Sequence, residues 1–195
     1  AARRYVALGE RVTALRLRLA ASPDSDSREA VRRDLTALVA ARRSASEVRA
    51  ATVMLDSVFA PLTPGEELVV ARAAASSGPP ARAVAGYARA FDAGIGNGED
   101  RFGYATALGK VGRYADAAFQ FNLVRAPRSL LASAAYQRAR ALVRDGQVSE
   151  GREALVAIGR RFPSDTAAAS IALFLLGDLA ADDRADDQAR RYNSR

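Results

Sequence analysis

The sequence predicts an all-α protein in which paired helices stack as an α-α superhelix. Apolar residues recur at helical spacing along almost the whole chain, and no segment alternates as a half-buried strand would. A pattern also repeats every 34 residues: a mid-helix alanine, a glycine seven residues later and a bulky residue nine residues after the glycine. Its three copies are Ala71, Gly78 and Tyr87; Ala105, Gly112 and Phe121; and Ala139, Gly146 and Leu155. A period of this length is typical of a helix–turn–helix solenoid.

Residues 1–62 are expected to form N-terminal helical hairpins. Their first helix is predicted over residues 2–21. The second is expected to begin at Asp26, because Glu29 stands three residues later, at the spacing of a capping box. The third is expected to follow Ser44, which has the same spacing to a glutamate.

Residues 63–195 are expected to form repeats, and they open with the clearest helix start in the chain, Thr63-Pro64-Gly65-Glu66. The threonine can cap a helix, the proline suits the first helical position and the glutamate can bond back to the cap. From here the helices are expected in pairs. The first helices of the four pairs are predicted at 64–76, 99–111, 128–145 and 165–182, and the second helices at 79–92, 113–125, 147–162 and from 184 to the end.

Small residues explain how such pairs can pack closely. Each first helix has one near its middle and each second helix has one near its start: Ala71, Ala105 and Ala139, then Ala83, Ala117 and Gly151. Without long side chains there, two helix axes can approach to about 8–9 Å. In the fourth pair Gly177 and Ala189 take these places, and this last repeat is expected to be truncated. The glycines between helices are expected to be left-handed, so that the chain can reverse: Gly78, Gly112 and Gly146.

Two stretches carry a resemblance to a known family: RYADAAFQF from Arg113 to Phe121, and LFLLGDL from Leu173 to Leu179. Arg161-Phe162-Pro163 also matches a repeat end. On these residues the chain resembles tetratricopeptide repeats over about 64–195, which implies a solenoid that binds other proteins. It departs from the pattern where a large aromatic residue of the first helix belongs, since other residues stand there: Glu67, Arg101 and Ala135.

The joint RRFPSDTAAA from Arg160 to Ala169, followed by ALFLLG from Ala172 to Gly177, is similar to joints in repeats of bacterial envelope proteins. These include the superhelical region of soluble lytic transglycosylases. The resemblance implies a periplasmic or envelope-associated protein and leaves two functions open. One is a non-catalytic scaffold for protein–protein interaction. The other is the superhelical domain of a peptidoglycan-cleaving transglycosylase, whose catalytic Glu-Ser and Gly-Leu-Met-Gln motifs do not occur in this sequence.

Cysteine and histidine are both absent from the sequence, which excludes thiolate nucleophiles, histidine-based zinc sites and Ser-His-Asp hydrolysis. We therefore assign no catalytic residue, no metal site and no cofactor. The formal net charge of +7 favours an anionic partner, but no recognition-helix motif supports nucleic acid. The longest apolar run is far shorter than the ~20 residues of a membrane span, so we expect no transmembrane segment.

The candidate binding residues lie where the first helices would line a concave face. Four are apolar or aromatic and four are cationic: Leu68, Phe102, Tyr136 and Phe174, with Arg72, Lys110, Arg140 and Arg144. Cations beside aromatic rings suit an acidic protein or peptide, and peptidoglycan is the alternative ligand. The competing interpretation is that the aromatic residues pack between repeats and the cations are solvated. Glu66 and Glu67, which could pass for a catalytic pair, are explained by helix capping and the helix dipole.

Overall fold

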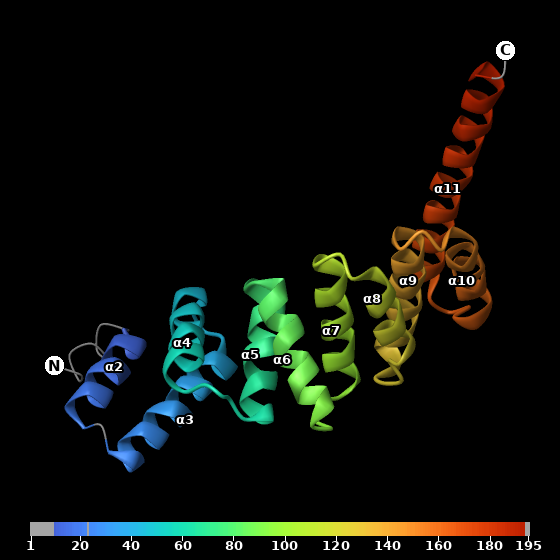
Figure 1. Ribbon diagram of the computed structural model, residues 1–195. Coiled ribbons are helices and arrows are strands. Elements are labelled where there is room, and N and C mark those ends of the chain that lie inside the picture. Colours follow the sequence, from blue (N-terminus) through green and yellow to red (C-terminus); the bar gives the residue numbers. More distant parts are fainter. Residues whose placement is uncertain (1–9, 23, 194–195) are drawn as a thin grey trace. The chain divides into compact units, whose positions relative to one another are not determined.

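The protein is described by a computed structural model over residues 10–22 and 24–193, with side chains as far as residue 184 (Figure 1). These residues are helical throughout apart from their connections, and no strand occurs among them, which confirms the all-α prediction. Their helices are α2 (Arg11–Ala21), α3 (Ser25–Ala41), α4 (Ala45–Val58), α5 (Pro64–Ser77), α6 (Pro80–Asp92), α7 (Gly98–Lys110), α8 (Tyr114–Asn122), α9 (Arg128–Arg144), α10 (Val148–Arg161) and α11 (Thr166–Asn193). None of them is both long and apolar enough to cross a bilayer.

The helices gather into two compact units, one up to Gly96 and one from Asn97 onward. In the first unit α3 packs against α2, α4 and α5, and α5 packs against α6. In the second unit each helix contacts the next, and α9 also contacts both α7 and α11. Within each unit this is the neighbour pattern of stacked helical hairpins. The superhelix itself, and the division between residues 1–62 and 63–195, stay predictions.

Three helix starts were predicted from capping residues, and the structure confirms two of them. At Thr63 a full capping box forms: the Thr63 hydroxyl accepts a bond from the Glu66 backbone N–H, and the Glu66 carboxylate accepts one from the Thr63 N–H. The Ser44 hydroxyl likewise caps α4. The start at Asp26 was wrong. Asp24 has the extended backbone that a cap needs, and its carboxylate accepts a bond from the Ser27 N–H, so α3 begins earlier.

The small residues lie at the helix contacts, as predicted. The five alanines of the pattern are fully buried: Ala71, Ala83, Ala105, Ala117 and Ala139. At Gly151 the approach is also close, because an added Cβ would lie 2.6 Å from Cγ2 of Val143 and 3.1 Å from the Ala139 carbonyl oxygen. The bulky residues of the pattern fill the space beside these contacts and are also buried: Tyr87, Phe121 and Leu155. Small residues therefore set how closely the paired helices pack.

Two of the three turn glycines adopt the predicted left-handed conformation. Gly112 has φ 80° and Gly146 has φ 86°. Residues with a Cβ atom rarely adopt such positive values. The prediction was wrong for Gly78, which is extended with φ −111° and ψ −168°. Gly78 precedes Pro79, and a proline ring disfavours the helical region for the residue before it.

The predicted fourth pair of helices is not present among the described residues. Instead of helices at 165–182 and from 184, a single helix, α11, runs from Thr166 to Asn193. The stretch from Asp182 to Arg184 has neither glycine nor proline, so nothing in it ends a helix. Gly177 is exposed and no atom lies within 4 Å of the position of its missing Cβ. The side chain of Ala189, its expected partner, lies outside the described residues.

The close contact at Gly151 gives a stability prediction. Gly151→Leu is expected to lower the free energy of unfolding by about 1–3 kcal/mol, because the new side chain would collide with Val143. The matched control is Gly159→Leu on the same helix, where no atom lies within 4 Å of an added Cβ. Urea denaturation followed by circular dichroism measures both. Equal effects of the two substitutions would contradict close packing at Gly151.

Candidate functional site

A groove in the second unit lies over α7, α8 and α9 and has a volume of about 290 Å³. Small and aromatic residues form much of its lining, with cations and amide or hydroxyl groups beside them: Ala105, Thr106, Gly109, Lys110, Tyr114, Ala117, Phe121, Gln137, Arg140, Ala141 and Arg144. Ala105 and Ala117 are fully buried. Because the side chains of Ala105 and Ala117 end at Cβ, they do not fill the groove over the contact between α7 and α8.

The groove is positively charged. Lys110 is the last residue of α7, while Arg140 and Arg144 lie one turn apart on α9 and so point the same way. None of the described residues that line the groove carries a carboxylate. Concentrated charge of one sign beside apolar walls attracts ligands of the opposite sign. The groove therefore favours an anionic ligand.

The two arginines have different surroundings. The guanidinium carbon of Arg144 lies 5.7 Å from the centre of the Tyr114 ring, within the range of a cation–π contact. Arg140 makes no hydrogen bond or ion pair with any described residue. An unsatisfied guanidinium offers five N–H donors in a planar fork, the geometry that binds a carboxylate through two parallel bonds. Arg140 is therefore the residue of the groove best placed to bind a carboxylate.

The eight residues predicted from the sequence are divided between the two units, and some of those in the second unit lie together. The groove brings together three of the predicted cations: Lys110, Arg140 and Arg144. Phe102 is half-buried and packs edge-on against Phe121, with ring centres 5.3 Å apart. Tyr136 is half-buried against the apolar core that α9 shares with α10 and α11.

The remaining three predicted residues lie elsewhere. Leu68 and Arg72 belong to the first unit, where Leu68 is buried and Arg72 half-buried on α5. Phe174 lies on α11 and is 73% exposed. Packing between helices thus accounts for Leu68, Phe102 and Tyr136, and the cations of α7 and α9 are the part of the predicted set that lines an open groove.

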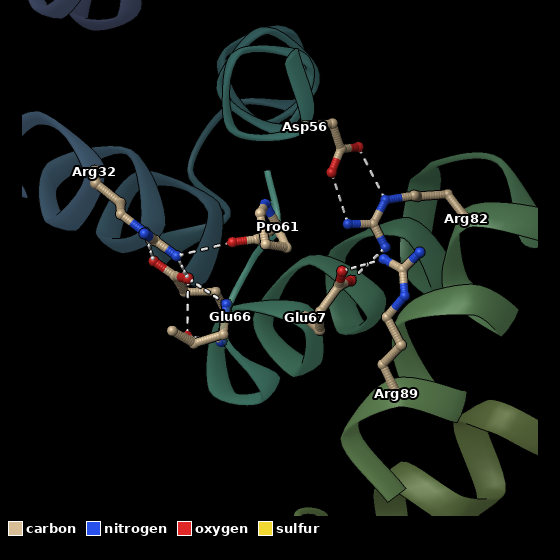
Figure 2. Close-up of polar contacts among 8 residues, drawn as sticks. Arg32, Asp56, Pro61, Glu66, Glu67, Arg82 and Arg89 are labelled. Carbon is tan, nitrogen blue, oxygen red and sulfur yellow. Dashed lines mark hydrogen bonds and ion pairs between the residues drawn. The ribbon is translucent and has the colours of Figure 1, made fainter. Parts of the chain in front are cut away.

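A second charged cluster, in the first unit, was not expected from the sequence (Figure 2). Glu67 is only 1% exposed, and its carboxylate lies between Arg82 and Arg89 of α6. One Nη of Arg82 is 2.7 Å from Glu67 Oε2, and the other edge of the same guanidinium binds both oxygens of Asp56 at 2.7 and 2.9 Å. Two cations thus meet two anions, so the cluster carries no excess charge.

A sequence signal for this cluster existed. Glu67 stands where the repeat pattern has a large inward-facing aromatic residue. A carboxylate at an inward position needs a cation, because an unpaired buried charge is very costly. Helix capping therefore explains only Glu66, which forms the capping box and also binds Arg32 of α3 through two bonds of 2.5 and 2.6 Å. A hollow of about 700 Å³ lies beside Arg82 and Arg89, and the cations at its edge are already paired.

A further hollow in the second unit, of about 200 Å³, lies between α8, α9 and α10. Its three arginines are all engaged: Arg125 donates to the Asn122 carbonyl, Arg138 pairs with Glu150 at 2.6 Å and Arg161 lies over the Phe162 ring. The groove over α7, α8 and α9 differs from these hollows, because its Arg140 forms no hydrogen bond or ion pair with the described residues. We call it the cationic groove.

Comparisons of this chain with protein-family models, with curated proteins and with solved structures found no match.

The Glu67 cluster gives a prediction on stability. Glu67→Ala is expected to lower the free energy of unfolding by about 1.5–3 kcal/mol, because the half-buried Arg82 loses a charge-assisted hydrogen bond and keeps only its bonds to Asp56. Glu153→Ala, at an exposed position of α10, is expected to change it by less than about 0.5 kcal/mol. Thermal and urea unfolding measure both. A loss at Glu67 as small as that at Glu153 would mean that the cluster is not a structural clamp.

Glu66 gives a prediction on pH. Burial raises the pKa of Glu66, but hydrogen bonds from Arg32 and from the backbone and hydroxyl of Thr63 together lower it below its usual 4.5. A lowered pKa in the folded state means that the ionised carboxylate stabilises the fold above pH 4.5, and that this stabilisation is lost as the pH falls through the lower, folded value.

Glu66→Gln is therefore expected to be less stable than the unmodified protein by about 1.5–3 kcal/mol at neutral pH. The difference is expected to shrink once the pH falls below the folded-state pKa. Urea unfolding of both proteins across this pH range measures it, with Glu153→Gln as the control. A difference that is the same at neutral and acid pH would contradict the role of the ionised carboxylate.

Proposed function

We propose that this chain is a non-catalytic helical-repeat scaffold of the bacterial cell envelope that binds an acidic segment of a protein partner in the cationic groove. The observation that carries the proposal is the placement of Lys110, Arg140 and Arg144 around one groove whose described lining has no carboxylate. The helices of the second unit hold these side chains near one another, which suits recognition of a partner segment with several negative charges.

The chemistry of the groove supports binding rather than catalysis. Arginine, lysine, glutamine and threonine supply hydrogen-bond donors, and Tyr114 supplies an aromatic face. The sequence has no histidine and no cysteine to act as a base or nucleophile near neutral pH. Carboxylates bind arginine through paired, charge-assisted bonds, which are stronger than neutral hydrogen bonds. An acidic peptide is thus the ligand class that this lining fits best.

Placement in the envelope rests on sequence likeness at the joint from Arg160 to Ala169, and membership of the tetratricopeptide class rests mainly on the stretches from Arg113 to Phe121 and from Leu173 to Leu179. In the structure Phe162 ends α10 and lies half-buried against the core of α9 to α11. A second candidate function follows from the same joint: the chain as the superhelical domain of a peptidoglycan-cleaving transglycosylase. The cationic groove favours this candidate too, because the peptide stems of peptidoglycan also carry free carboxylates.

Fluorescence anisotropy with a short labelled glutamate-rich peptide tests the proposal. We expect saturable binding that weakens with salt, and no binding of the same peptide with glutamine in place of glutamate. Arg140→Glu with Arg144→Glu is expected to weaken binding at least about tenfold, since repulsion replaces attraction at both positions. Circular dichroism checks the fold, and Arg140→Gln alone serves if the double variant does not fold.

The matched control is Arg128→Glu with Arg160→Glu, which changes the net charge equally on exposed positions of α9 and α10 away from the cationic groove. Unchanged binding by the Arg140 and Arg144 variant, or equal binding of the glutamine peptide, would contradict the proposal. Single-stranded DNA bound as tightly as the peptide would show a general affinity for polyanions. Co-sedimentation with purified peptidoglycan, lost in the same variant, would favour the second candidate.

A further inference from the structure

Helix α11 has exposed large apolar side chains as well as residues that pack in its core. Ala172 and Leu179 pack against α9 and α10, whereas Ile171, Leu173 and Phe174 are 49%, 68% and 73% exposed. Figure 1 shows α11 continuing beyond the ends of α9 and α10. Several large apolar residues exposed together on one helix are unusual for a surface without a partner. We therefore expect a partner surface to cover α11 around Phe174.

The repeat pattern shows which face this is. When α11 is aligned with α9 so that Gly177 matches Ala139, Leu173 and Phe174 match Ala135 and Tyr136. On α9 those two residues are half-buried in the core shared with α10. On α11 the corresponding face has no covering helix among the described residues, and Gly177 has no atom within 4 Å of its missing Cβ. In this alignment the exposed face of α11 corresponds to a helix-packing face, and no described helix covers it.

In the same alignment, acidic residues of α11 stand where α9 has the basic residues of the cationic groove. Asp178 and Asp182 of α11 fall at the places of Arg140 and Arg144 of α9. Both aspartates are exposed, and neither makes a hydrogen bond or ion pair with the described residues. Each pair of charges lies one helical turn apart, at a spacing of about 6 Å. The acidic pair thus matches the basic pair in spacing and opposes it in sign.

We propose that α11 of one copy of this chain docks on the cationic groove of a second copy. Asp178 and Asp182 lie against Arg140 and Arg144, and Phe174, one turn before Asp178, covers the apolar part of the groove beside Tyr114. This deepens the proposed function, on which it rests, by naming the acidic partner as a second copy. Two exposed ion pairs contribute little alone, so the covering of Phe174 supplies the rest of the affinity and the contact is sensitive to salt.

The proposed contact is between two different surfaces, the acidic side of α11 and the cationic groove. Every copy carries one of each. Such a contact gives a closed pair if two copies exchange their helices, and an open chain if they do not. Either form has a mass above that of the monomer, and its fraction increases with protein concentration. Charge reversal on one of the two surfaces is expected to block association. Mixing a variant changed in the groove with a variant changed in α11 is expected to restore it.

Sedimentation velocity over a range of protein concentrations tests this. In low salt the unmodified protein is expected to associate at concentrations up to about 100 μM, and in about 1 M NaCl, where the screening length is only ~3 Å, it is expected to be monomeric. Arg140→Asp with Arg144→Asp, and separately Asp178→Arg with Asp182→Arg, are each expected to associate at least about a hundredfold more weakly. An equal mixture of these two variants is expected to associate again, because both contacts between them pair opposite charges. The acidic α11 of one variant meets the basic groove of the other, and the basic α11 meets the acidic groove.

The control is Arg128→Asp with Arg160→Asp, which is expected to associate like the unmodified protein. A separate variant, Phe174→Ser, is expected to weaken association without any change of charge. A monomer in low salt, association unaffected by either charge reversal, or a mixture that stays monomeric would each overturn the proposal. If the groove still binds the glutamate-rich peptide while the protein is monomeric, the second copy is the wrong partner and the proposed function stands.

Discussion

The structure depends on close contact between paired helices through small side chains. Ala105, Ala117 and Ala139 are fully buried, and Gly151 lies so near Val143 that even one added carbon would collide with it. This contact has a second consequence. Where the side chains end at Cβ, nothing fills the space above them, and the cationic groove lies over Ala105, Ala117 and Ala141. The residues that let the helices pair also leave room for a ligand.

The arginines of the Glu67 cluster and those of the cationic groove have different surroundings. In the first unit the buried carboxylate of Glu67 binds Arg82 and Arg89, and Glu66 binds Arg32, so these charges hold helices together. In the second unit Arg140 makes no such pair with the described residues, and Arg144 lies against an aromatic ring. The net charge of +7 is therefore less informative than the places where arginine has no carboxylate beside it.

Much of the fold could be predicted because each signal was local. Thr63 with Glu66 fixed a helix start, and Gly112 and Gly146 fixed two turns, since these residues act through their own backbone. Gly78 failed because the proline after it overrides the glycine. The fourth pair of helices failed because its turn was inferred from the repeat period alone, without a residue that ends a helix. In the cationic groove, the spacing of four residues placed Arg140 and Arg144 side by side on one helix. Whether an aromatic side chain faces a ligand or a neighbouring helix depends on packing, which the sequence pattern does not specify.

The central claim is that the cationic groove is the surface through which this chain recognises acidic groups. Nuclear magnetic resonance of the isotope-labelled protein, titrated with the glutamate-rich peptide, tests it most directly. The account predicts that the largest shifts fall on the backbone around Lys110, Tyr114, Arg140 and Arg144, and that they saturate. Shifts centred on the Glu67 cluster, or spread over exposed arginines of both units without saturation, would contradict it.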